Sequence, residues 1–156
     1  MTARTKTRPA ACSIVTVERQ LTAVVRITVA MSELMQAQMA SRAKIAQALP
    51  TLEAGTVGLG VTLWRPAAGG LYMEPGVLVG RAFAAKGEVV PSELPAGRAA
   101  HYVLNGSYAG LPGAWQTLLG WCAEQGLERA GTQWEIYGPP NADEAKQETR
   151  LYALLA

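Results

Sequence analysis

The sequence has few of the side chains that most catalytic and metal sites need. It contains one histidine, His101, and two cysteines, Cys12 and Cys122, in 156 residues. A Ser-His-Asp or Cys-His system would therefore depend on His101, and its spacing places neither Ser107 nor Cys122 beside it in a nucleophile turn. We expect no Cys/His metal site, no cofactor, two reduced structural thiols and a histidine that is satisfied or at the surface.

Charge and long hydrophobic runs are also scarce. The net charge of +2 is too small to favour nucleic acid, and the patterns of helix-turn-helix, zinc-finger and basic-helix proteins are missing. No glycine pattern opens a helix in the phosphate-binding manner. No apolar run approaches the ~18 residues of a membrane span, and the N-terminus lacks the apolar core of a signal peptide. We therefore expect a cytoplasmic protein without direct nucleic-acid or membrane partners.

The remaining composition is that of an ordinary globular domain. Hydrophobic residues make up 49% of the 156, a length that suits one domain with a substantial core. We expect a flexible tail over residues 1–12 and a single domain over residues 13–156. Residues 85–95 contain one glycine and two prolines and are expected to be mostly connector. Strand patterns occupy 13–30, 56–64, 71–74, 77–83, 97–104, 133–137 and 150–155, with loops at 66–70, 75–76 and 141–148.

Two segments show helical periodicity. Between Ser32 and Pro50, apolar residues recur at steps of three and four, with Ser32 as the expected N-cap and Pro50 as the expected stop. Three methionines on this helix either belong to the core or line an adaptable binding surface, and the core is the commoner case. The second helix, over 110–125, carries a proline in its first turn and precedes a glycine.

The strand over residues 133–137 organises the rest of the chain. Because strand side chains alternate between faces, Glu135 and Tyr137 share one face while Trp134 and Ile136 share the other. If the Trp134 face packs on the core, Glu135 faces a groove, where a carboxylate needs a partner or water.

The sequence pattern of this strand occurs once before in the chain, and we call this short repeat the sequence echo. Residues 61–66 and 134–139 both read bulky, polar, aliphatic, aromatic, any residue, proline. The match is short enough to arise by chance, but the order of elements also repeats. The two together predict strand-helix-strand-strand halves over about 13–84 and 95–156. The fold class expected is α+β: one mostly antiparallel sheet with both helices on one face.

Aromatic residues occur in both halves of the sequence. Ring faces around a single carboxylate suit a flat or lipophilic cation, at about 0.5–2 kcal/mol per cation–π contact. The alternative, of equal weight, is that the rings form the core and Glu135 makes a surface ion pair with Arg98 or Arg150. The residues concerned are Trp64, Tyr72, Tyr102, Tyr108, Trp115, Trp134, Tyr137 and Tyr152.

Four segments of the second half occur in the order and spacing of a known family. They are residues 95–100, the turn at 105–108, the strand at 134–140 and the final strand at 149–152. The first half fits mainly through the strand that ends at Trp64. In these features the chain resembles the GyrI-like small-molecule-binding domains, also found as the effector-binding part of bacterial multidrug-sensing transcription activators. One departure is Asn105, which stands where the family usually has histidine.

The resemblance implies a duplicated fold of the SHS2 type with a ligand cleft between the halves. Glu135 would lie at the floor of this cleft, with Tyr137, Tyr108 and Trp64 as walls. Further ligand-binding candidates are Tyr72, Tyr102 and Tyr152.

Two functional classes follow from the resemblance, and a third is weaker. The first is a stand-alone binding domain for lipophilic, planar or cationic small molecules, which would need a protein partner, such as a regulator, for any contact with DNA. The second is a hydrolase that opens strained cyclopropane rings in toxic natural products, with Glu135 as the base that activates water. Burial among aromatic rings would raise the pKa of such a base. The third is inhibition of a topoisomerase through protein–protein contact.

Overall fold

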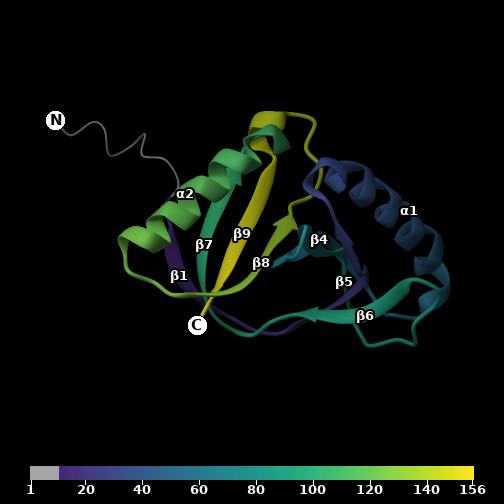
Figure 1. The fold of residues 1–156 in the computed structure, drawn as a ribbon. Helices are drawn as coiled ribbons and strands as arrows, with labels where there is room; N and C mark the ends of the chain where they lie inside the picture. The colour runs from purple at the N-terminus through teal and green to yellow at the C-terminus, as the bar shows by residue number, and fades with distance from the viewer. Residues whose placement is uncertain (1–10) are drawn as a thin grey trace.

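The computed structural model describes residues 11–156, which form two α-helices and nine β-strands (Figure 1). Most of the predicted tail thus lies outside the described residues. The strands are β1 (Ser13–Val17), β2 (Gln20–Val25), β3 (Ile27–Val29), β4 (Val57–Ala67), β5 (Gly70–Val79), β6 (Val89–Leu94), β7 (Gly97–Asn105), β8 (Arg129–Tyr137) and β9 (Glu148–Leu155). The helices are α1 (Leu34–Leu52) and α2 (Leu111–Glu124), with short 3-10 turns η2 (Met31–Glu33), η3 (Tyr108–Gly110) and η4 (Glu144–Lys146).

The strands form one antiparallel sheet, which confirms the predicted α+β class. Its order is β1-β7-β9-β8-β4-β5-β2-β6, with β3 paired to β5. The two halves meet at the centre, where β4 pairs with β8. There Thr62 lies opposite Glu135, and the flanking pairs join Val61 to Ile136 and Leu63 to Trp134. This register is symmetric about the Thr62–Glu135 pair, as the sequence echo requires if the halves are related by a pseudo-twofold axis.

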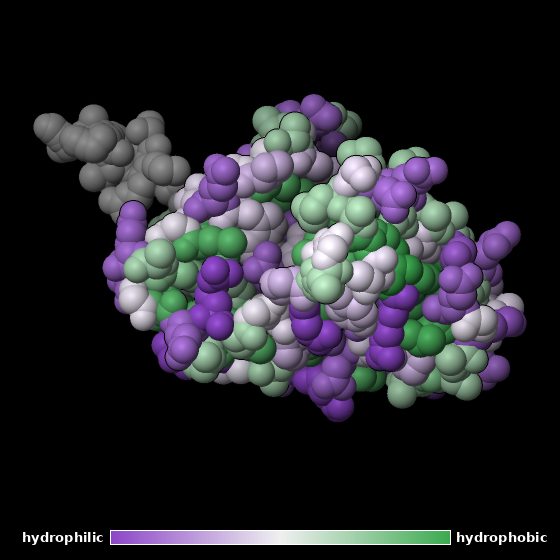
Figure 2. All heavy atoms as spheres, in the orientation of Figure 1, coloured by the Kyte–Doolittle hydropathy of each residue, from purple (hydrophilic) through white to green (hydrophobic). Residues whose placement is uncertain are grey.

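Both helices lie on one face of the sheet, one over each half (Figure 1). Under α1 a core cluster contains Ala23, Ile45 and Val79, and under α2 a second contains Leu118 and Leu151. Neither described helix is long and apolar enough to cross a membrane. On the surface drawn in Figure 2, hydrophobic and hydrophilic residues are interspersed, consistent with the low charged fraction of the chain.

A third core cluster lies on the opposite face of the sheet. It joins Leu63 and Trp134 of the central strands to Leu94 of β6, and Val15 of β1 packs against it. Since β1 and β6 are the two ends of the sheet, the sheet curves until both ends contact its centre. This curvature buries Trp134, which is 1% exposed, and thereby fixes the side of β8 that carries Glu135.

The prediction that residues 85–95 are mostly connector was wrong for the second part of this segment, because β6 occupies Val89–Leu94. Pro91 obscured the strand in the sequence. Proline lacks a backbone N–H and is confined to edge strands in sheets, and β6 is an edge strand of this sheet.

The predicted break at Pro75-Gly76 is also absent, since β5 runs through both residues. Gly76 is required there because β2 approaches closely: a Cβ atom at Gly76 would lie 2.0 Å from the carbonyl oxygen of Ala23. The expected loop at 66–70 shrinks to a two-residue turn between β4 and β5, whose glycine, Gly69, has a φ of 77°.

The boundaries of α1 differ from the prediction at both ends. Ser32 makes no capping hydrogen bond, because a 3-10 turn begins at Met31 and leads into the α-helix. Pro50 lies inside the last turn, and the helix continues to Leu52, followed by Glu53, whose φ is 56°. A proline near a helix C-terminus removes one intrahelical hydrogen bond but leaves the following residues free to keep helical angles.

Candidate functional site

A cleft of about 760 Å³ lies between the two halves, on the helical face of the sheet. Strands β4 and β8 supply its floor, and the first turns of both helices supply its sides. Its volume is within the 300–1,000 Å³ range of small-molecule sites. The lining residues are Met31, Leu34, Met35, Gln38, Met39, Arg42, Trp64, Leu71, Tyr108, Leu111, Pro112, Trp115, Gln133, Glu135 and Tyr137.

Glu135 is a buried carboxylate at the cleft floor, 1% exposed. Its two oxygens have separate donors. The indole N–H of Trp115 donates to Oε2 at 2.6 Å, and the hydroxyl of Tyr137 donates to Oε1 at 2.7 Å. One donor comes from α2 and the other from the same face of β8, so the carboxylate is held between helix and sheet. The alternative of a surface ion pair with Arg98 or Arg150 is therefore wrong.

A chain of hydrogen bonds from α1 also reaches Glu135. Thr62 Oγ1 accepts from Gln38 Nε2 at 3.0 Å and from Arg42 Nη2 at 2.9 Å, and it lies 2.8 Å from the hydroxyl of Tyr137. A hydroxyl accepts two hydrogen bonds and donates one. The Thr62 hydroxyl must therefore donate to Tyr137, and the Tyr137 proton is directed at Glu135.

Arg42 is the second charged residue of the cleft lining. Its guanidinium donates to the carbonyl oxygens of Val61 at 2.8 Å and Gly76 at 3.1 Å, and lies 5.3 Å from the centre of the Tyr137 ring. Gly60 leaves the space for this arrangement: a Cβ there would come within 3.4 Å of the Tyr137 ring and 3.5 Å of Arg42 Nη1. The close approach at Gly60 is thus made by the side chains of Tyr137 and Arg42.

The pKa of Glu135 is raised above its ordinary value. Burial is the main cause, because it penalises the charged form. The hydrogen bonds from Trp115 and Tyr137 and the charge of Arg42 oppose the shift by favouring the carboxylate. The pKa of Tyr137 is also raised, chiefly by burial and by the neighbouring Glu135, so this hydroxyl stays protonated and keeps its role as a donor.

Aromatic rings form the walls of the cleft on both sides of Glu135. Trp64 meets Trp115 edge to face at 6.4 Å between ring centres, and Tyr108 meets Tyr137 in the same way at 5.7 Å. The indole N–H of Trp64 is buried and has no hydrogen-bond partner within residues 11–156. A buried donor without a partner is uncommon in native structures.

Methionines form the rim of the cleft along α1. Met31, Met35 and Met39 are 64%, 76% and 68% exposed, so the expectation that they belong to the core is wrong. They recur every four residues from η2 into α1 and therefore share one face of the helix. Flexible thioether side chains at a cleft rim suit contact with ligands of varied shape.

Comparison with known proteins identifies the family. The sequence matches the GyrI-like small molecule binding domain over residues 10–155. This chain belongs to the GyrI-like family. No curated protein matches the sequence of this GyrI-like domain.

Solved structures share the fold of the GyrI-like domain at low sequence identity. The C-terminal domain of EcmrR has a TM-score of 0.76 and 17% identity, with 94% of this chain and 98% of that one covered. In an EcmrR–DNA complex the TM-score is 0.78 and the identity 15%, covering 97% of this chain and 59% of that one. SAV2435 bound to tetraphenylphosphonium has a TM-score of 0.73 and 10% identity, with 94% of each chain covered. A hydrolase from Listeria innocua has a TM-score of 0.57 and 12% identity, with 98% of this chain and 96% of that one covered.

The structure brings four of the predicted site residues of the GyrI-like domain together and leaves three elsewhere. Trp64, Tyr108, Glu135 and Tyr137 line the cleft, whereas the other three do not. Those three are Tyr72, on the opposite face of the sheet; Tyr102, which packs in the core under α2; and Tyr152, stacked between Trp134 and His101.

Sequence reasoning missed the polar partners of Glu135. Gln38 and Arg42 lie on the periodic stripe of α1, where two polar residues among apolar ones were the available signal. Thr62 was indicated by the echo itself, because it is the counterpart of Glu135 in the first half. The spacing of these residues alone did not show that their side chains converge.

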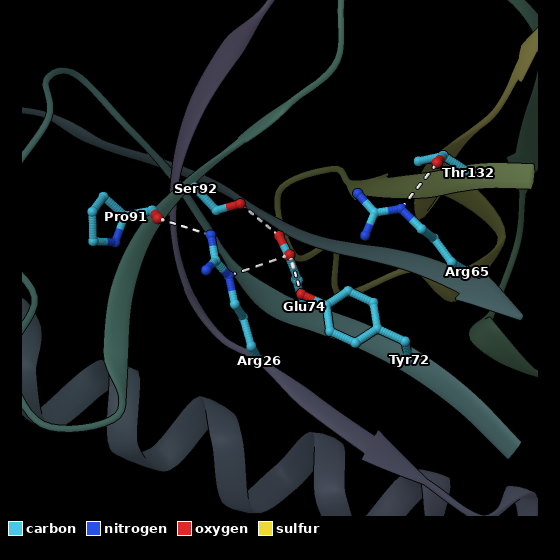
Figure 3. A network of polar contacts seen from close by, with 7 residues as sticks. All are labelled: Arg26, Arg65, Tyr72, Glu74, Pro91, Ser92 and Thr132. Atoms are coloured by element: carbon cyan, nitrogen blue, oxygen red, sulfur yellow. Dashed lines mark hydrogen bonds and ion pairs between the residues drawn. The ribbon is translucent and has the colours of Figure 1, made fainter. Parts of the chain in front are cut away.

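A second buried carboxylate, Glu74, lies on the opposite face of the sheet (Figure 3). It accepts hydrogen bonds from Tyr72 and from Ser92 Oγ at 2.7 Å, and Arg26 Nε lies 3.5 Å away. Burial, together with the hydrogen bond to Glu74 and the negative charge of Glu74, raises the pKa of Tyr72 to about 12, while the charge of Arg26 opposes this shift. Because Arg26 lies between β2 and β3 and Ser92 on β6, the network joins strands at this end of the sheet.

Proposed function

We propose that this GyrI-like domain binds lipophilic small molecules, planar or cationic, in the cleft over Glu135. The observation that carries the proposal is a fully buried carboxylate, held by donors from a helix and a strand, beneath an open cleft with aromatic walls. Such a carboxylate is costly to bury. A role confined to stability would be served as well by an apolar side chain.

The lining supports ligands that are flat and largely apolar. Trp64, Trp115 and Tyr108 offer ring faces or edges, and the methionines of α1 close one side. The domain would act as an effector-binding module that reports ligand occupancy to a protein partner, such as a regulator. The fold of the EcmrR C-terminal domain supports this arrangement.

Ligand binding can be tested by quenching of tryptophan fluorescence. Trp64 and Trp115 line the cleft, so a bound planar molecule should quench their emission with saturation. A panel of planar lipophilic cations and neutral analogues would be titrated into the wild-type domain and into Glu135→Gln, with product formation followed by mass spectrometry. Saturable quenching without product supports the binding role, and the absence of quenching by every compound would refute it.

A second candidate function is hydrolysis of a bound molecule that contains a strained ring. The observation in its favour is the raised pKa of Glu135, which suits a general base near neutral pH. Glu135 would take a proton from water as the water oxygen attacks a ring carbon. The electron pair of the broken C–C bond would pass to an electron-withdrawing group of the ligand, which is then protonated.

Glu135→Gln separates the two functions. Hydrolysis predicts that the variant binds ligand but forms no product. Binding alone predicts that neither protein forms product and that the variant has weaker affinity for cations. The folded state of the variant would be checked by circular dichroism, because glutamine offers one oxygen where Trp115 and Tyr137 supply two donors.

A further inference from the structure

The methionine rim, formed by Met31, Met35 and Met39, differs chemically from the rest of the cleft lining. Each of these three side chains lines the cleft and is largely exposed. The sulfur of a thioether is a nucleophile, and a peroxide that can reach it converts it to a sulfoxide. The rim therefore places three oxidisable groups at the mouth of the cleft.

The rim lies outside the part of α1 that packs on the sheet. Further along the helix, Ile45, Leu49 and Leu52 belong to the core cluster under α1 or pack against it. None of the rim methionines belongs to a core cluster of residues 11–156. A change of polarity at the rim should therefore alter the cleft and leave the packing of α1 on the sheet intact.

The other sulfur atoms of residues 11–156 are protected from oxidation. Met73, on β5, is 0% exposed. Cys122 is buried and Cys12 is half-buried. Burial raises the pKa of both thiols, so little of the reactive thiolate forms near neutral pH. Within the described chain a peroxide is thus directed to the rim.

We propose that Met31, Met35 and Met39 are a modification site for peroxides, and that their oxidation to sulfoxides closes the cleft to lipophilic ligands. The second statement rests on the proposed function. With hydrogen peroxide, a sulfur lone pair attacks one oxygen, and the S–O bond forms as the O–O bond breaks. The departing hydroxide takes the proton of the transferred oxygen and leaves as water. Sulfur loses the two electrons that the peroxide gains.

Oxidation reverses the polarity of the surface that a ligand would contact. A thioether is apolar and flexible, whereas a sulfoxide is polar and carries a hydrogen-bond acceptor. A lipophilic ligand packed against the oxidised rim would remove water from the sulfoxide oxygens and offer no donor in return. Methionine sulfoxide reductases restore the thioether, so the loss of affinity would be reversible.

Treatment with hydrogen peroxide tests both statements. The proteins compared are the wild type, the triple variant Met31→Leu/Met35→Leu/Met39→Leu and Met73→Leu, because leucine has a similar volume and cannot be oxidised. Peptide mass mapping locates each added oxygen atom. Isothermal titration calorimetry measures the affinity for tetraphenylphosphonium, a lipophilic cation, and for N-methylacridone, a flat neutral molecule. Each protein before treatment is its own reference, and circular dichroism checks that the treated protein stays folded.

The rim methionines of the wild type should be oxidised under conditions that leave Met73 unmodified. The treated wild type should bind both probes roughly five- to thirtyfold more weakly, because the sulfoxide oxygens lose water without gaining a partner. Incubation with sulfoxide reductases should restore the affinity. The triple leucine variant should show no change on treatment, and Met73→Leu should lose affinity as the wild type does.

Each other outcome refutes a defined statement. Oxidation of Met73 before the rim overturns the modification site. Unchanged affinity in a protein with an oxidised rim overturns the effect on the cleft, while the proposed function stands because binding persists. An equal loss in the triple leucine variant also overturns this effect, since its cause would then lie outside the rim. If neither probe binds the untreated wild type, the proposed function and the effect on the cleft both fail, and the peptide map still decides the modification site.

Discussion

Replacing Tyr137 with phenylalanine deletes one buried hydroxyl and keeps the ring that packs against Arg42 and Tyr108. The change removes the hydrogen bond to Glu135 and leaves the Thr62 hydroxyl without an acceptor, and both of these partners are at most 1% exposed. A hydrogen bond to a charged group contributes about 1.5–3 kcal/mol, and a buried unpaired hydroxyl costs about 1 kcal/mol. We expect the free energy of unfolding to fall by about 2–4 kcal/mol at pH 8, or Tm by roughly 5–15 °C.

The cost of Tyr137→Phe should depend on pH. The pKa of Glu135 is raised in the folded protein, so the native state binds this proton more tightly than the unfolded state does. The native state therefore loses stability as pH rises from the ordinary carboxyl range through the folded pKa. Removing a donor to the carboxylate raises that pKa further. The variant should then lose more stability than the wild type as the pH rises.

Urea unfolding followed by far-ultraviolet circular dichroism at pH 5 and pH 8 measures this difference. Tyr102→Phe is the control, because the Tyr102 hydroxyl has no hydrogen-bond partner within residues 11–156, and a change below about 0.5 kcal/mol is expected. A loss for Tyr137→Phe that is equally small, or that does not grow between pH 5 and pH 8, would refute the hydrogen-bond chain described here.

Three further predictions concern Glu135, the methionine rim and the second carboxylate. Glu135→Gln should abolish the part of the wild-type stability loss that accompanies rising pH, so its unfolding free energy relative to wild type should increase from pH 5 to pH 8; a constant difference in urea unfolding would contradict the raised pKa. The double variant Met35→Ala/Met39→Ala should keep the free energy of unfolding within about 0.5 kcal/mol of wild type. Its affinity for planar ligands, measured by calorimetry, should fall roughly three- to tenfold; unchanged affinity would exclude the methionine rim from binding. Glu74→Gln should cost about 1–3 kcal/mol, because glutamine keeps one oxygen where the part-buried hydroxyls of Tyr72 and Ser92 each donate to a separate one. Ligand affinity should stay within about twofold; a loss of affinity would show that the two faces of the sheet are coupled.

The sequence was sufficient for the fold class and for the position of Glu135. Periodicity and the echo of residues 61–66 in 134–139 predicted two halves, and the β4–β8 register is consistent with this relation. Alternation along one strand also placed Glu135 and Tyr137 on the cleft face. These features depend on local spacing, which a sequence displays directly.

The remaining parts of the site depend on contacts between distant segments. Tyr72 and Tyr152 have the composition of cleft residues, but strand pairing puts them on the opposite face of the sheet. Met35 reads as a core residue because it lies on an apolar stripe, yet that stripe meets an open cleft. Pro91 hid a strand because local propensity does not reveal which strands are edges.

The pairing of Thr62 with Glu135 at the centre of the β4–β8 register, where a twofold axis relating the two halves would pass, limits how such a site can be built. If two identical chains each supplied one half, identical residues would have to meet at this axis. Two glutamates would then place like charges side by side in a buried position, whereas two threonines would leave the cleft without an acid. Joining both halves in one chain allows this position to carry a single carboxylate and a neutral hydroxyl, whose hydrogen bond to Tyr137 directs the Tyr137 proton at Glu135. Asymmetry at that one pair of positions is what allows a scaffold of two similar halves to hold one acid at its centre.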